Sequence, residues 1–208
     1  MIPSDILMAF AATTALLAMA PGPDNIFVLT QSALHGRRAG LAVTMGLCTG
    51  VLVHTLLVAF GVAAVLQASP AAFTALKTAG VAYLLYLAWG AFRAGSAILS
   101  AQGNGRVSPA KLYLLGVVMN LTNPKVAIFF LAFLPQFVDP AAGNVVKQLG
   151  LLGVVFVCMT LLVFGAVALT AGSLGSFLRR SVMAQTVLNR VAGTVFLALA
   201  LSLALAER

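Results

Sequence analysis

The chain has 208 residues, of which 62% are hydrophobic and only 8% are charged. An ordinary soluble domain is about 25% charged, so this composition excludes a soluble globular protein. The formal net charge is +8, and a basic protein can bind nucleic acid. Here, however, the basic residues lie in short loops between apolar stretches, which favours membrane topology over nucleic-acid binding as the cause. The composition therefore predicts an all-α polytopic protein of the lipid bilayer.

Six apolar segments follow one another along the chain, and we interpret them as six transmembrane helices. Their approximate limits are 6–34, 41–66, 73–93, 112–133, 149–172 and 191–206. The first is interrupted by Pro21, Gly22, Pro23, Asp24 and Asn25, and the fourth by Asn123, Pro124 and Lys125. Proline removes a helical hydrogen bond and clashes with the preceding turn, so helices 1 and 4 are predicted to be broken at these proline motifs.

The basic residues are distributed unequally between alternate loops. Eight fall in the first, third and fifth loops, namely Arg37, Arg38, Arg93, Arg106, Lys111, Arg179, Arg180 and Arg190. Three fall on the opposite side, namely Lys77, Lys147 and Arg208. The positive-inside rule places the odd loops in the cytoplasm, which predicts that both termini lie outside.

Three spans in each half require that any internal duplication be inverted. Three pairs of similar motifs, which we call echoes, occur in the same order in both halves. The first pairs Pro23-Asp24 with Pro124-Lys125, and the second pairs Arg37-x-x-Gly40-Leu41 with Lys147-x-x-Gly150-Leu151. The third pairs Lys77-x-Ala79-Gly80-x-x-Tyr83-Leu84 with Arg190-x-Ala192-Gly193-x-x-Phe196-Leu197. A chain rich in Ala, Gly, Leu and Val produces chance matches, but their common order favours a repeat. We expect one membrane transport domain over 1–208, built from inverted three-helix repeats at about 1–99 and 108–208.

Discontinuous helices at corresponding positions of two inverted halves are typical of a transporter's binding site. Asp24 and Lys125 are predicted to share one depth in the membrane, where each ionised group costs roughly 2.5–3.5 kcal/mol. Two interpretations stay open: an ion pair that holds the halves together, or a zwitterionic amino acid with its ammonium toward Asp24 and its carboxylate toward Lys125. Neutral donors and acceptors near the breaks are supplied by Asn25, Asn120, Thr122 and Asn123.

His54 lies about midway along the second apolar segment. An intramembrane histidine can relay protons, since its unperturbed pKa is near 6.5. Alternatively, it is a neutral side chain hydrogen-bonded between helices. The two cysteines, Cys48 and Cys158, show no metal-ligand spacing, so neither a metal site nor another cofactor is expected.

Four blocks of sequence make the chain resemble the LysE/RhtB family of amino-acid exporters. They are Pro21-Gly22-Pro23, the glycine-spaced GLCTGVLVH at 46–54, YLLYLAWGAFRAG at 83–95 and NPKVAIFFLAFLPQFV at 123–138. The resemblance covers nearly the whole chain. It implies a multi-pass exporter of amino acids or close derivatives in the bacterial inner membrane, driven by the proton gradient, rather than an enzyme. It also leaves a homo-oligomer open.

Two other functions compete with an exporter that works by alternating access. One is a membrane thiol-disulfide electron carrier that uses Cys48 and Cys158, whose separation of 110 residues equals the offset of the second echo. The other is a small-solute channel. Two broken helices in an inverted repeat favour the exporter.

Overall fold

The computed structural model describes residues 2–68, 70–94 and 107–205, and this part of the chain is helical throughout, without strands. The main helices are α1 (Ser4–Met19), α2 (Pro23–His35), α3 (Arg37–Ala68), α4 (Pro70–Arg93), α5 (Pro109–Thr122), α6 (Pro124–Ile128), α7 (Val145–Arg180) and α8 (Val182–Leu205). After α6 come a π-helix, η1 (Phe129–Phe133), and two 3-10 segments, η2 (Leu134–Phe137) and η3 (Pro140–Ala142). The predicted all-α class is confirmed.

Both predicted helix breaks are present. The axes of α1 and α2 differ by 62°, and those of Pro109–Thr122 and Pro124–Phe137 differ by 51°. Pro23 and Pro124 each lie in the first turn of the helix that follows the break, where a missing N–H removes no helical hydrogen bond. The side chain of Asn123 caps α6, because its Oδ1 accepts the main-chain N–H of Lys125 at 3.0 Å.

The number of membrane spans is only partly established. By length and composition, the described residues contain three helices that can cross a membrane, at 37–61, 145–171 and 182–205. The two bent pairs raise this number to five if each pair is one span. Helix α4, which corresponds to the predicted third span, does not meet the same criterion within the described residues. Six spans therefore stay a prediction.

The sixth helix differs from its predicted limits of 191–206. It begins at Val182, and Ser181 Oγ accepts the N–H of Ala184 at 3.1 Å in its first turn. Because α7 continues to Arg180, only Ser181 separates the two helices. The predicted fifth loop is therefore too long, since Arg179 and Arg180 lie in α7 and Arg190 lies in α8.

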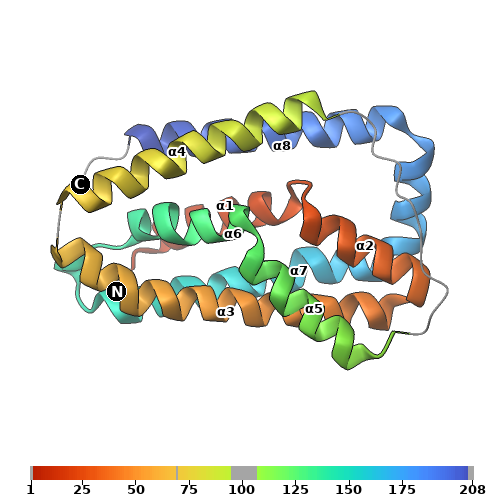
Figure 1. The fold of residues 1–208 in the computed structure, drawn as a ribbon, viewed down its shortest axis with the longest axis horizontal. Helices are drawn as coiled ribbons and strands as arrows, with labels where there is room; N and C mark the ends of the chain where they lie inside the picture. Colours follow the sequence, from red (N-terminus) through yellow and green to blue (C-terminus); the bar gives the residue numbers. More distant parts are fainter. Residues whose placement is uncertain (1, 69, 95–106, 206–208) are drawn as a thin grey trace.

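Figure 1 shows α1 and α6 in the middle of the molecule, with α3 and α7 on one side and the packed pair α4 and α8 on the other. The first residues of α1 and the last of α8 lie at one end of the bundle. The turn between α2 and α3 and the junction between α7 and α8 lie at the opposite end. Residues 96–106 of the predicted third loop, and Arg208, lie outside the described residues.

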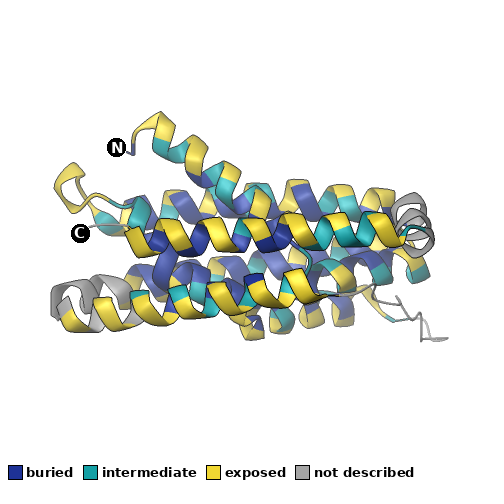
Figure 2. Ribbon diagram, turned by 90° about the horizontal axis from the view of Figure 1, so that it is seen from above, coloured by how far each residue is buried: buried dark blue, intermediate teal, exposed yellow. Residues whose placement is uncertain are grey.

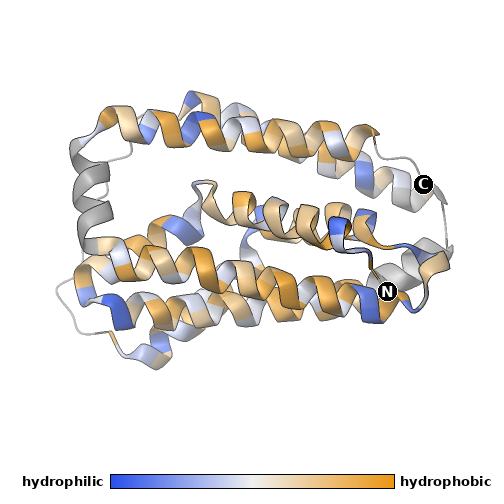
Figure 3. Cartoon of the chain, turned by 180° about the vertical axis from the view of Figure 1, so that it is seen from behind, coloured by the Kyte–Doolittle hydropathy of each residue, from blue (hydrophilic) through white to orange (hydrophobic). Residues whose placement is uncertain are grey.

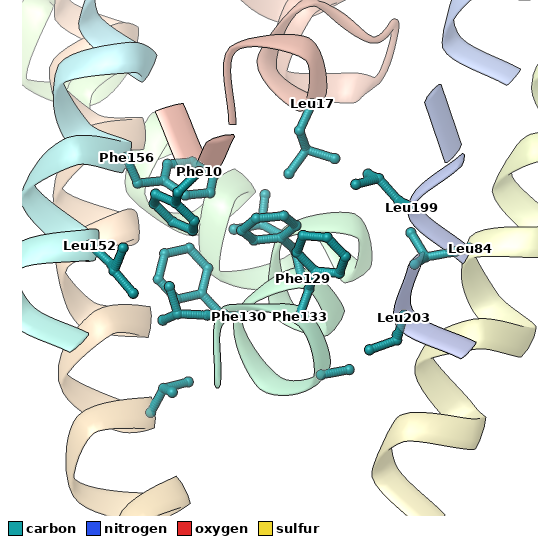
Figure 4. Packing of buried hydrophobic residues seen from close by; sticks show 14 of the residues in the cluster. Phe10, Leu17, Leu84, Phe129, Phe130, Phe133, Leu152, Phe156, Leu199 and Leu203 are labelled. Carbon is teal, nitrogen blue, oxygen red and sulfur yellow. The ribbon is translucent and has the colours of Figure 1, made fainter. Parts of the chain in front are cut away.

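Two apolar clusters fill the interior around the helix breaks. The first is rich in aromatic rings from α1, η1 and α7, among them Phe10, Phe129, Phe130, Phe133 and Phe156 (Figure 4). The second consists mainly of smaller side chains from α2, α3, α5 and α7. The breaks at 20–22 and at Asn123 lie where the chain passes from one cluster to the other.

Large apolar side chains also cover much of the outer surface. Phe60 on α3 is 71% exposed and Leu162 on α7 is 64% exposed. Figure 2 shows exposed positions along the outward faces of the helices, and Figure 3 shows that these helices are hydrophobic over most of their length. Such extensive apolar exposure suits contact with lipid.

Candidate functional site

Lys125 is buried at the junction of the two broken helices, with an exposed fraction of only 6%. Its Nζ donates to the main-chain oxygens of Leu17 and Ala20, each at 3.2 Å. Both oxygens belong to the C-terminal end of α1, so a side chain from α6 closes the end of a helix about 105 residues earlier in the chain. Although Asp24 and Lys125 interact electrostatically, Nζ donates to these oxygens and not to the carboxylate, as judged from the described residues.

Asp24 lies in the first turn of α2 and is 2% exposed. The side chains of Asn120 and Asn123 and the ammonium of Lys125 are close enough to interact with its carboxylate. Hydrogen-bonding geometry is nevertheless incomplete, because Asp24 Oδ1, Asn120 Oδ1 and Asn123 Nδ2 are all buried without a partner within the described structure. Buried polar atoms are rarely left unpaired, so this cluster has unused capacity to bind a polar ligand.

Each break frees a particular carbonyl group. In a helix the carbonyl of residue i accepts the N–H of residue i+4, and proline has no N–H. Pro21 therefore leaves Leu17 O free for Lys125, and Pro124 leaves Asn120 O without its helical donor. Asn120 O instead accepts the N–H of Asn123 at 3.1 Å.

His54 provides a second partner for the same carbonyl. Its Nε2 lies 3.3 Å from Asn120 O, and because a carbonyl only accepts, Nε2 carries the proton in this contact. The ring is buried and stacks on Phe130, with 5.4 Å between ring centroids and 22° between planes. The interhelical hydrogen bond, one of the two alternatives for His54, is therefore present, whereas a proton relay stays a prediction.

Asn25 belongs to the first break. Its Nδ2 donates to Ala18 O at 2.7 Å, while its Oδ1 is buried without a partner among the described atoms. Thr122, in contrast, does not join the cluster. Its side chain is exposed, and its hydroxyl donates back to Val118 O at 2.8 Å. Thr122 therefore lies beside the break, as the sequence indicates, at the end of α5.

Close packing of α3 against α5 brings His54 to Asn120. A Cβ added to Gly46 would overlap the carbonyl oxygen of Tyr113, and one added to Gly50 would lie 2.5 Å from Asn120 Oδ1. Gly116 has the same role on α5, since a Cβ there would overlap Val43 O. Small residues let helix backbones approach closely, and here they set the position of Asn120.

The remaining predicted residues shape the breaks. Pro21 and Gly22 form the linker between α1 and α2, and a Cβ at Gly22 would lie 3.2 Å from Lys125 Nζ. Pro23 and Pro124 are exposed, so they act on the backbone and do not line the cluster.

The two cysteines differ in exposure. Cys48 is buried and Cys158 is exposed, and both are free thiols.

Two features of the site were not predicted. One is the role of the main-chain oxygens of Leu17 and Ala20, although the first could have been found by counting back four residues from Pro21. The other is the π-helix that follows α6, for which the sequence carries no simple signal. No group of three or more His, Cys, Asp and Glu side chains that could hold a metal occurs among the described residues.

The family model of the LysE type translocators matches residues 15–207. This chain belongs to the LysE family. A translocator family is a family of transport proteins, so this LysE member is not an enzyme. Comparison with solved structures gives no match.

Several relatives are similar over most of their length. An uncharacterized membrane protein of Vibrio cholerae is 32% identical over 203 residues, which are 97% of this chain and 98% of the relative. The homoserine/homoserine lactone efflux protein of Salmonella typhimurium is 32% identical over 91% of each chain. The leucine efflux protein of Enterobacter sp. strain 638 is 34% identical over 62% of this chain and 61% of its own.

Proposed function

We propose that this chain is a secondary active exporter of amino acids or close derivatives across the bacterial cytoplasmic membrane. Its relatives include efflux proteins named for homoserine, homoserine lactone and leucine. The proposal includes coupling to the proton gradient, alternating access around the breaks at Pro21–Asn25 and Asn123–Lys125, and termini on the outer side.

One observation carries the proposal, namely two buried and opposite charges at the junction of two broken helices, with unpaired polar atoms around them. Asp24 and Lys125 are 2% and 6% exposed. A plain ion pair would satisfy the carboxylate with the ammonium, yet Lys125 Nζ donates to Leu17 O and Ala20 O, and Asp24 Oδ1 has no partner among the described atoms. A zwitterion offers both the donor that Asp24 lacks and an acceptor for Lys125.

The charge of the cluster favours a neutral side chain on the substrate. Asp24 and Lys125 balance each other, and the other polar side chains there, Asn25, Asn120 and Asn123, are uncharged. A zwitterion adds no net charge to the buried site, whereas a dibasic or diacidic amino acid adds one that has no counter-ion in the cluster. The relatives' names refer to neutral amino acids or a derivative of one.

The test is export of labelled amino acids from loaded vesicles, with and without a proton gradient, by the wild type and three variants. The variants are Asp24→Asn, Lys125→Gln and the double replacement, each measured for membrane abundance as well as export. If the charges bind substrate, the double variant reaches the membrane and remains unable to export. Recovery of both abundance and export in the double variant would show that the two charges only neutralise each other.

A fall in wild-type export when the proton gradient is removed supports coupling to protons. Lys147→Gln is the matched control, because Lys147 is an exposed lysine at the start of α7. Export by this control should equal that of the wild type. A wild type that exports none of the neutral amino acids contradicts the proposed function.

A further inference from the structure

The C-terminal end of α1 lies inside the protein, so its last carbonyl groups need donors other than water. A helix leaves its last four carbonyls without helical partners, and in a membrane each unmet group costs several kcal/mol. Leu16 O accepts the N–H of Ala20, and Ala18 O accepts Nδ2 of Asn25. Leu17 O and Ala20 O both accept from one ammonium group, that of Lys125.

The electrostatic potential at the C-terminal end of α1 is negative and favours a cation. The C-terminus of a helix carries a partial negative charge of about half an electron, and two oxygens at 3.2 Å from one nitrogen add directed acceptors. The carboxylate of Asp24, buried and with Oδ1 unpartnered among the described atoms, adds a full negative charge nearby. Two carbonyl oxygens and a nearby carboxylate thus favour a cation at this position.

The cation that fills this position is not part of α1. Lys125 belongs to α6, and its four-carbon side chain crosses to the opposite break. Its ammonium has three N–H donors, and within the described residues two of them are used. The absence of a side chain at Gly22 leaves room for the ammonium, since a Cβ there would lie only 3.2 Å from Nζ. A movement of α6 relative to α1 would withdraw the ammonium and leave the carbonyl oxygens in place.

We propose that Leu17 O, Ala20 O and the Asp24 carboxylate form a binding site for a primary ammonium group, which Lys125 occupies in this conformation. During transport the α-ammonium of the amino acid takes this position, and the released Lys125 binds the substrate carboxylate. This inference rests on the proposed function and refines it. The substrate ammonium displaces the Lys125 ammonium from its acceptors, instead of entering an empty space between Asp24 and Lys125.

Lys125→Ala tests the site without knowledge of the substrate. The replacement removes three methylene groups and the ammonium, and n-propylammonium supplies the same atoms. The melting temperature of the purified variant in detergent should rise by about 5–10 °C at an amine concentration 100-fold above its dissociation constant. The wild type, whose site is filled, and Lys147→Ala should show no such rise.

Two further probes separate ammonium binding from general solvent effects. n-Propanol has the same shape without the charge, and tetramethylammonium has the charge without N–H donors, so neither should raise the melting temperature of Lys125→Ala. An equal rise with either probe, or with n-propylammonium in the wild type, would overturn the site. If Lys125→Ala does not accumulate, its membrane abundance in cells grown with n-propylamine is the readout, and no gain there also overturns it.

Export tests the exchange separately. Free amino acids should leave wild-type vesicles at least tenfold faster than their N-acetyl derivatives, which lack the ammonium group. Equal rates would overturn the exchange. A wild type that exports none of these compounds would contradict the proposed function, while the melting temperatures of Lys125→Ala would still decide whether the ammonium site exists.

Discussion

Gly46 and Gly116 set the closest approach of α3 and α5, and alanine at either position tests whether this approach builds the site. A Cβ at Gly46 would overlap Tyr113 O and lie 3.0 Å from the Cα of Gly116, while a Cβ at Gly116 would overlap Val43 O. The obstructing atoms belong to the main chain, so no change of side-chain rotamer relieves the overlap. The two helices must move apart.

The magnitude follows from two opposing effects. Overpacking of a well-packed interior costs about 1–3 kcal/mol, whereas alanine in place of glycine favours a helix by roughly 0.5–1 kcal/mol. We expect each variant to lose about 1–2 kcal/mol of stability, which for a chain of this size lowers the melting temperature by roughly 2–8 °C. Export should fall as well, because separation of α3 from α5 moves Asn120 away from His54.

Gly90→Ala and Gly165→Ala are the matched controls, since no atom lies within 4 Å of a Cβ added at either position. These controls lie in α4 and α7 and should keep or raise the melting temperature. The assay is thermal unfolding in detergent together with vesicle export. A Gly46→Ala protein that melts at or above Gly90→Ala would refute the reasoning about the crossing, and normal export by a destabilised Gly116→Ala would refute its link to the site.

Two further predictions concern the thiols and the topology. Replacement of Cys48 and Cys158 together by alanine should leave export largely intact, because neither thiol supplies the charge that a zwitterion needs; loss of export, with a redox-sensitive crosslink between them in the native protein, would favour the electron carrier. In this cysteine-free protein, Gly103→Cys should react with impermeant reagents only from the cytoplasmic side and Ala142→Cys only from outside, and labelling of Ala142→Cys from the cytoplasm alone would overturn the assigned orientation.

The helix breaks could be predicted from the sequence because proline acts locally. Pro21 and Pro124 each lack the N–H that the carbonyl four residues earlier would accept in a helix, and both breaks are observed. Helical periodicity also explains why Thr122 does not join the polar cluster. It lies two residues from Asn120, about 200° around the same helix, so the two side chains cannot face one cluster.

The partner of Lys125 could not be predicted in the same way. Its place at the second break follows from the sequence, but its hydrogen bonds depend on where α6 crosses α1, which is a property of the tertiary packing. Likewise, the start of α8 at Val182 was missed because the polar residues Gln185, Asn189 and Arg190 interrupt the apolar pattern there. A hydropathy pattern marks the residues that contact lipid. A helix can extend beyond those residues, as α8 does at its start.

The two breaks are stabilised in different ways, and this difference favours movement at the first. Pro21 frees Leu17 O and Pro124 frees Asn120 O, and each carbonyl accepts a side chain from another span. His54 is held on the long helix α3 by close glycine packing and by the ring of Phe130. Lys125, in contrast, reaches Leu17 O through a flexible four-carbon side chain. The donor at the first break thus sits on a flexible side chain, whereas the donor at the second is a ring stacked on Phe130 of η1. For the proposed ammonium exchange, the C-terminal end of α1 is therefore the more favourable of the two breaks.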